Sequence, residues 1–468
     1  MSKQSNNKEI KASFWYICSA VIVKGAAFFS TPIFTRILST SEYGEVSTFL
    51  SLYTLLLPVF TLELPYSVGR AKIDYIDDFH NYVKNIFVLS ALFDIPIAIV
   101  ILLFVRFFEL GLLRYDYIII LVVYLYFSPC VVIAQNKYRY EYDYKKNIFL
   151  SQIIAIGGII LSILLLIVFN HEKVFLRLIG VVLPTIIVSV FLCISNIFKR
   201  SVHINIEYWK YGLKISIPLI AHSLSLNILS QSDRVFIKKY CGASQTGIYS
   251  LVYMYSMMIT LLTTSILDGW LPWFHENYHL KNYEQISNNV TKLVVLGCYI
   301  GLACIGLAPE AVNVLGGYEY REGLKCVPVV VLGTVLMFTY THYVNIEMHL
   351  KKTVFVSVGT VLAGGLNVFL NFIIVPYYGY VGAAWTTLIS YLMLFMLHYT
   401  ITKRILHVNI YSIKYILFSL FLTSLLSFVL YKLYDQIVIR CMIIIFGFIS
   451  MIIFFRKDIN RIIKMKSK

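Results

Sequence analysis

The feature of this sequence that most limits its fold is a series of apolar runs, each of about 20 residues, that recurs along the whole chain. A helix of about 20 apolar residues crosses a hydrocarbon core roughly 30 Å thick. Only 14% of the 468 residues are charged and 59% are hydrophobic, whereas a soluble domain carries about 25% charge. Most of the runs also lack the polar face that a helix in a large soluble protein would carry. The sequence therefore predicts an all-α, polytopic membrane protein.

The apolar runs predict about fourteen transmembrane helices, joined by connections too short to hold a soluble domain. The first run is longer than the core of a signal peptide and has no clear cleavage site, so we expect it to be retained as a helix. The predicted spans are 13–34, 44–66, 84–106, 115–135, 148–170, 176–198, 212–236, 246–268, 291–308, 326–346, 353–375, 380–402, 412–433 and 436–455.

The net charge of +16 is explained by topology rather than by nucleic acid. If the N-terminus is inside, the cytoplasmic segments hold 27 of the 40 Lys and Arg residues, the outer segments hold 12, and Lys24 lies within a span. This bias follows the positive-inside rule and predicts that both termini are cytoplasmic. The tail RKDINRIIKMKSK then lies beside anionic lipid.

An internal repeat divides the predicted helices. Residues 33–51 align with residues 236–254, so that Gly44 falls on Gly247 and Arg36 on Lys239. The offset of six spans keeps the orientation, as in transporters with parallel repeats. We therefore expect two six-helix lobes around a central cavity, followed by two extra helices and a basic tail. The corresponding residues are 1–200, 201–405 and 406–468.

One motif favours an enzyme. Residues 275–279 read HENYH, which on a helix places two imidazoles on one face to bind zinc. No third ligand is apparent, and the segment 270–290 is predicted to be an interfacial, amphipathic connection. The eight cysteines are scattered through apolar runs and include no CxxC pair, so they resemble small hydrophobic residues. We expect no metal site, no cofactor and no catalytic residues.

Ionisable residues inside predicted spans are the better functional candidates, because a charge at the membrane centre costs roughly 2.5–3.5 kcal/mol on insertion scales. Cations occur in the first span of each half, which suits a polyanionic ligand. The alternative for each residue is a structural ion pair or a side chain that reaches the interface. The candidates for substrate binding are Lys24, Arg36, Arg234 and Lys239, and those for ion coupling or charge pairing are Glu63, Asp94, Asp233 and Asp268.

Four segments resemble the Wzx-type O-antigen and polysaccharide flippases of the multidrug/oligosaccharidyl-lipid/polysaccharide exporter superfamily. They are PIFTRILSTSEYG, SDRVFI with TGIYS, WLPWF, and NVFLNFIIVPYYGYVGAAWTT at 367–387. The resemblance covers nearly the whole chain. It implies a multi-pass protein of the inner (cytoplasmic) membrane that translocates an undecaprenyl-pyrophosphate-linked oligosaccharide. It also implies a polysaccharide polymerase and a chain-length regulator as partners.

Three other functions remain open at this point. A lipid II flippase and an ion-coupled multidrug exporter belong to the same superfamily, and the exporter would favour a carboxylate-rich cavity with aromatic cages. A glycan polymerase or ligase would need large polar outer loops, which this chain lacks. The sequence has no GxxxxGK[ST] motif to bind a nucleotide phosphate, so an ion or substrate gradient must drive transport.

Overall fold

The computed structural model describes residues 3–108, 111–169, 171–195 and 203–466, and within these ranges all regular structure is helical. The helices divide into two compact units, Met1–Gly247 and Ile248–Lys468. Thirteen helical segments are long and apolar enough to cross a membrane. One of them, Thr353–Ile405, is too long for a single crossing and breaks at Gly379, so the described residues provide fourteen spans. The predicted all-α membrane architecture is confirmed.

The first unit contains eight helices and the first turn of a ninth. The helix α8 lies within this unit because it packs on α2, α3 and α4, and α2 also packs on α5. Burial of Phe49, Phe60, Leu125 and Leu178 forms one apolar core. The helices are α1 (Lys3–Ile37), α2 (Thr40–Thr61), α3 (Leu64–Asp74), α4 (Phe79–Phe108), α5 (Tyr115–Tyr140), α6 (Tyr144–Val168), α7 (Lys173–Cys193) and α8 (Ile206–Cys241).

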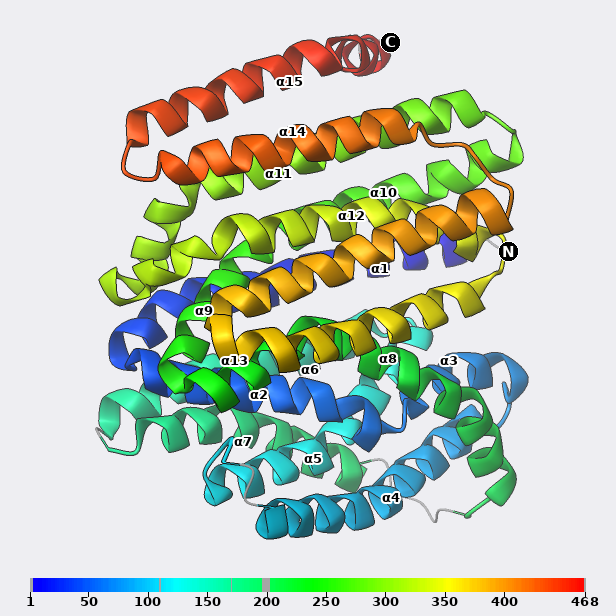
Figure 1. Cartoon of the computed structure of the whole chain (residues 1–468). Helices are drawn as coiled ribbons and strands as arrows, with labels where there is room; N and C mark the ends of the chain where they lie inside the picture. The colour runs from blue at the N-terminus through cyan, green and yellow to red at the C-terminus, as the bar shows by residue number, and fades with distance from the viewer. Residues whose placement is uncertain (1–2, 109–110, 170, 196–202, 467–468) are drawn as a thin grey trace. The chain divides into compact units, whose positions relative to one another are not determined.

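The second unit is built around α12, which packs on α13, α11 and α10. The two halves of α13 fold back along each other at Gly379, as Figure 1 shows in yellow and orange. The elements are α9 (Ala243–Ser256), α10 (Met258–His279), α11 (Tyr283–Gly316), η2 (Tyr318–Lys325), α12 (Val327–His349), α13 (Thr353–Thr400), η3 (Ile401–Ile405), α14 (Ile413–Lys432) and α15 (Ile437–Lys466).

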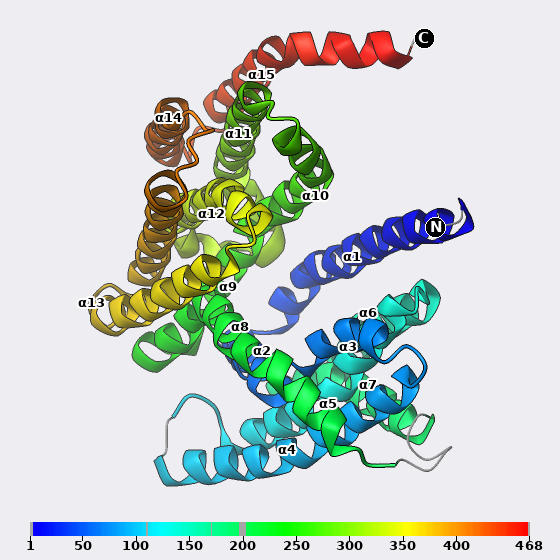
Figure 2. The same cartoon turned by 90° about the vertical axis from the view of Figure 1, so that its right-hand side faces the viewer.

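The last two helices lie against α11, α14 more extensively than α15 (Figure 2). The buried Arg440 of α15 reaches α11, where its Nη1 and Nη2 atoms donate to Glu310 at 2.9 and 2.7 Å. Arg440 also donates to the carbonyl oxygens of Gly306 and Leu433. Bidentate pairing of this kind is strong because both bonds are charge-assisted.

Two predicted segments differ from the structure. The expected interfacial connection at 270–290 is wrong, because α10 continues to His279 and α11 begins at Tyr283. Trp270 and Phe274 are buried and keep this stretch helical, since α10 packs along α12. Glu63, expected inside a continuous span, instead lies in a left-handed break between α2 and α3. The break precedes Pro65, which lies in the first turn of α3 and cannot continue a preceding helix.

The segments that define the internal repeat contact each other within the first unit. A Cβ atom on Gly44 would lie 1.8 Å from the carbonyl oxygen of Ala243, and one on Gly247 would lie 2.1 Å from that of Thr40. Residues 40 and 243 differ by the same 203 positions as residues 44 and 247. The contact is therefore reciprocal: each repeat glycine lies against the backbone four residues before the other. The lobe boundaries at 200 and 405 stay a prediction.

Candidate functional site

Lys24 is exposed in the middle of the apolar part of α1. By helix rise it lies roughly 14 Å from Trp15 and roughly 20 Å from Ile37, the ends of the membrane-length segment. Helix α1 packs mainly on α6, and the Lys24 ammonium is not covered by that contact. A charge at this depth needs a partner or a hydrated cavity. The exposed ammonium is accessible to such a cavity.

Arg36 and Lys239 lie in the last turns of α1 and α8, as their equivalence in the repeat predicts. Both side chains are exposed. The neighbouring Lys238 is different, because it forms a half-buried ion pair with Glu45 of α2. The sequence analysis missed Glu45, which could be recognised only as an acidic residue one position after the repeat glycine.

Arg234 and Asp233 are buried in α8, with 7% and 0% of their surfaces exposed. The Arg234 Nη1 atom donates to the Ser230 carbonyl at 2.9 Å and to Gln231 Oε1 at 3.1 Å. Ser51 of α2 donates to the same Gln231 oxygen at 3.1 Å. The Arg234 guanidinium thus belongs to a hydrogen-bond network that connects α8 with α2. Its predicted role in substrate binding stays a prediction.

A polar cavity of about 370 Å³ lies beside the break between α2 and α3. Glu63, Asn136 and Arg139 line it together with Ser223 and Asn227 of α8. Asn227 Nδ2 also donates to the Thr54 carbonyl at 2.6 Å. The sequence analysis identified Glu63 alone, because Asn136 and Arg139 follow the end of the predicted span 115–135, where polar residues are ordinary.

The other two acidic candidates differ in burial. Asp94 of α4 is 1% exposed and accepts a hydrogen bond from Ser90 Oγ at 3.1 Å. Its second oxygen, Oδ1, makes no hydrogen bond to any described residue. Asp268 is exposed on α10. Asp94 is therefore a buried, partly satisfied carboxyl group, and its role in ion coupling or charge pairing stays a prediction, as does that of Asp268.

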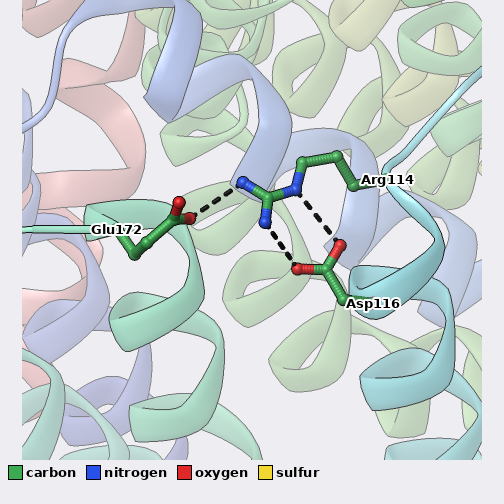
Figure 3. A network of polar contacts seen from close by, with 3 residues as sticks. All are labelled: Arg114, Asp116 and Glu172. Carbon is green, nitrogen blue, oxygen red and sulfur yellow. Dashed lines mark hydrogen bonds and ion pairs between the residues drawn. The ribbon is translucent and has the colours of Figure 1, made fainter.

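An exposed ion network joins two loops of the first unit, as Figure 3 shows. Arg114 donates to Asp116 at 2.8 and 3.2 Å and to Glu172 at 2.8 Å. Arg114 and Glu172 are the residues that cap α5 and α7. The hydrogen bonds to Asp116 and then Glu172 raise the pKa of the Arg114 guanidinium. Because the network is solvated, it positions the loops and adds little stability.

The HENYH motif lies at the end of α10, and His349 of α12 lies beside it. The Nδ1 atoms of His275 and His349 are 2.7 Å apart, and the ring centre of His279 is 5.3 Å from that of His349. In the described ranges, no three His, Cys, Asp or Glu side chains are arranged to hold a metal ion. The histidines instead pack α10 on α12.

If the protein exports a glycan, as the resemblance in the sequence implies, the double substitution of His275 and His279 by Gln should leave that export largely intact. Glutamine keeps hydrogen-bonding capacity, and the packing of α10 on α12 also involves Trp270 and Phe274. Surface glycan in a complementation assay, together with zinc analysis of the purified protein, tests this. Loss of export by the variant, with stoichiometric zinc in the parent protein, would support the enzyme interpretation instead.

The sequence analysis also missed a buried acid–base pair in the second unit. His398 Nδ1 lies 2.8 Å from Glu347 Oε1, and both side chains are fully buried. The residues are 51 positions apart, on α12 and the second half of α13. Only the folding of α13 onto α12 brings them together.

Comparison with known proteins identifies the family. The model of the family described as "Polysaccharide biosynthesis protein" matches residues 10–278, more than half of the chain. The chain belongs to this family. The match confirms the predicted resemblance to polysaccharide flippases of the multidrug/oligosaccharidyl-lipid/polysaccharide exporter superfamily.

Two curated relatives are similar to this member of the polysaccharide biosynthesis family over part of their length. Capsular polysaccharide biosynthesis protein CapF of Staphylococcus aureus is 24% identical over 229 residues, which are 45% of this chain and 55% of CapF. The uncharacterized membrane protein MJ1375 of Methanocaldococcus jannaschii is also 24% identical, over 43% of this chain and 46% of its own. The matched region thus spans about half the length of each relative.

Solved structures show that the family member has a transporter fold. Lipid II flippase MurJ in an inward closed conformation superposes with a TM-score of 0.77 over 96% of this chain and 100% of MurJ, at 14% identity. An inward-facing MATE multidrug transporter of the MOP superfamily gives a TM-score of 0.55 over 87% of this chain and 99% of its own, also at 14% identity. At these identities the likeness concerns the fold alone. The protein is therefore a multi-pass membrane protein with the helical architecture of flippases and exporters.

Proposed function

We propose that this protein translocates undecaprenyl-pyrophosphate-linked oligosaccharide repeat units, of O-antigen or a related surface polysaccharide, from the cytoplasmic to the outer leaflet by alternating access. The observation that carries the proposal is the exposed ammonium of Lys24 in the middle of α1. A lysine there needs a hydrated path, and a pyrophosphate is the part of the substrate that hydrocarbon rejects and a cation attracts.

The proposed path carries cations at two depths. Lys24 is at mid-span, while Arg36 and Lys239 lie at the ends of α1 and α8 that we expect at the outer surface. A head group that moves outward would exchange its interaction with Lys24 for interactions with these exposed cations. No bond is made or broken, and the polyprenyl tail stays in lipid. Asp94, Glu63, Asp233 and Asp268 remain candidates for ion coupling or charge pairing.

Two other substrates fit the same fold. The likeness to MurJ allows a lipid II flippase, and the likeness to MATE transporters allows a multidrug exporter. The family match and the similarity to CapF favour a polysaccharide precursor. Lysine at mid-span also favours an anion over the organic cations of an exporter.

The deciding experiment is a flipping assay in proteoliposomes that contain the purified protein. We expect undecaprenyl-pyrophosphate-linked oligosaccharide to cross the bilayer faster than in protein-free vesicles, and neither lipid II nor an organic cation to do so. Movement of lipid II alone would replace the proposal by a lipid II flippase. Uptake of the cation alone would replace it by an exporter.

We also propose an inner-membrane location with both termini in the cytoplasm, and a polysaccharide polymerase and chain-length regulator as partners. The charge bias places the loop 137–147 on the same side as the termini. Single cysteines at positions 140 and 465 of a cysteine-free variant should react with an impermeant thiol reagent only after the cells are opened. Labelling of either position in intact cells would contradict the topology.

A further inference from the structure

The strongest unassigned feature of the described chain is the pair formed by Glu347 and His398 in the second unit. The His398 Nδ1 and Glu347 Oε1 atoms are 2.8 Å apart, and neither side chain has an exposed surface. Glu347 Oε2 and His398 Nε2 are also buried, and neither makes a hydrogen bond to any described residue. Each side chain thus has one polar atom in a hydrogen bond and one without a partner among the described residues.

Two uncharged residues, Tyr340 and Gly359, lie against the pair. On α12 the ring of Tyr340 stacks on His398 with a centroid distance of 5.8 Å. The first half of α13 presents Gly359, where a Cβ atom would be only 3.0 Å from His398 Nε2. A phenol and a glycine supply no charge, and neither Glu347 nor His398 forms an ion pair with any other described residue.

The cations that lie near the pair in the sequence have exposed side chains. Lys351 and Lys352 follow α12, and their side chains are exposed, as are those of Lys403 and Arg404 in η3. The backbone N–H of Lys352 donates to the Glu347 carbonyl at 2.8 Å. These cations mark the end of α12 that the charge bias places in the cytoplasm.

We propose that Glu347 and His398 form a proton-binding site through which the second unit takes up and releases a single proton during transport. With the proton the pair is neutral, either as carboxylate and imidazolium or as carboxylic acid and imidazole. When the proton leaves for water on the Lys351–Lys352 side, the pair becomes a carboxylate beside a neutral imidazole. Because an isolated buried charge is unfavourable, that state requires the helices around it to admit water or a compensating charge.

The chemistry of the pair favours a proton over a metal cation. Hard cations such as Ca²⁺ and Mg²⁺ are bound by about six or more oxygen atoms. Here a single carboxylate oxygen, Glu347 Oε2, is available, beside an imidazole nitrogen. The contact of 2.8 Å between His398 Nδ1 and Glu347 Oε1 instead suits a single proton held between a carboxyl group and an imidazole.

The role of this site in transport rests on the proposed function, but its proton binding can be measured without any glycan. Infrared difference spectra of the purified full chain in lipid, recorded between acidic and alkaline buffers, should contain bands from the carboxyl group or imidazole that loses the proton. Glu347→Gln and His398→Gln should each remove these bands, and each should lower the proton release per chain by one proton. Two substitutions are used so that a folding defect in one leaves the other informative.

The matched control is His342→Gln. His342 is also a fully buried histidine on α12, and its ring nitrogens make no hydrogen bond to described residues, but it has no carboxylate partner. We expect this variant to keep the bands and the proton release of the parent. Unchanged spectra in both Glu347→Gln and His398→Gln would overturn the proposal. So would bands that respond to added sodium at constant pH and not to pH itself.

Discussion

Replacing Lys24 with Ala should strongly reduce glycan export while the protein still inserts at its normal level. The side chain is exposed at mid-span, so its removal leaves no cavity and no unpaired partner among the described residues. A charge-assisted hydrogen bond to a pyrophosphate contributes roughly 1.5–3 kcal/mol, which is about ten- to a hundredfold in affinity. Lys24→Arg should keep part of the activity, since the positive charge is kept and only the shape of the cationic group changes.

The measurement is surface glycan together with protein abundance in the membrane. Lys352→Ala is the matched control, because it removes an exposed lysine from the loop after α12 and should export normally. Equal export by Lys24→Ala at equal abundance would show that Lys24 does not bind the substrate. Arg234→Ala would be a poorer test, since this guanidinium is buried among hydrogen bonds to Ser230 and Gln231.

Gly44→Ala should severely destabilise the protein, although it adds one methyl group. The new Cβ atom would lie 1.8 Å from the Ala243 carbonyl oxygen and 2.9 Å from the Gly247 nitrogen. Both are backbone atoms, which cannot rotate away as a side chain can. Overpacking typically costs about 1–3 kcal/mol, and a clash between backbones belongs at or above the upper end. Thermal unfolding of the purified protein, followed by loss of monodisperse material, measures the effect.

Gly365→Ala is the control for the loss of a helical glycine. A Cβ atom at Gly365 of α13 would meet no other atom within 4 Å. Alanine is favoured over glycine within a helix by roughly 0.8–1.0 kcal/mol, so this variant should unfold at the same or a higher temperature than the parent. A Gly44→Ala protein as stable as Gly365→Ala would contradict the close contact between the two repeat segments.

The transmembrane helices were predictable because each span carries its own signal of length and hydropathy. The predicted spans 212–236, which contains Asp233 and Arg234, and 291–308, which is short, lie within α8 and α11. The breaks were harder to predict. Leu62 and Glu63 adopt a left-handed conformation that their residue types do not favour, and the apolar run continues through them.

Residues of the candidate site could be predicted only where a charged side chain lies within an apolar run of the sequence. Lys24 and Asp94 are recognisable because a charge within an apolar run is costly wherever the rest of the chain lies. Glu347 and His398 lie near the ends of their helices, where polar residues are ordinary. Their pairing depends on the packing of α12 against α13, and no local pattern in a single sequence encodes that distance.

The attachment of α15 has a consequence for how the chain is assembled in the membrane. Only 6% of the apolar window of this helix is buried, so most of its surface is left for lipid, while its Arg440 carries a charge that lipid disfavours. Glu310 on α11 is synthesised 130 residues earlier and can neutralise that charge as soon as α15 enters the bilayer. Insertion of α15 should therefore depend on α11 being in the bilayer already, with Glu310 placed to receive Arg440.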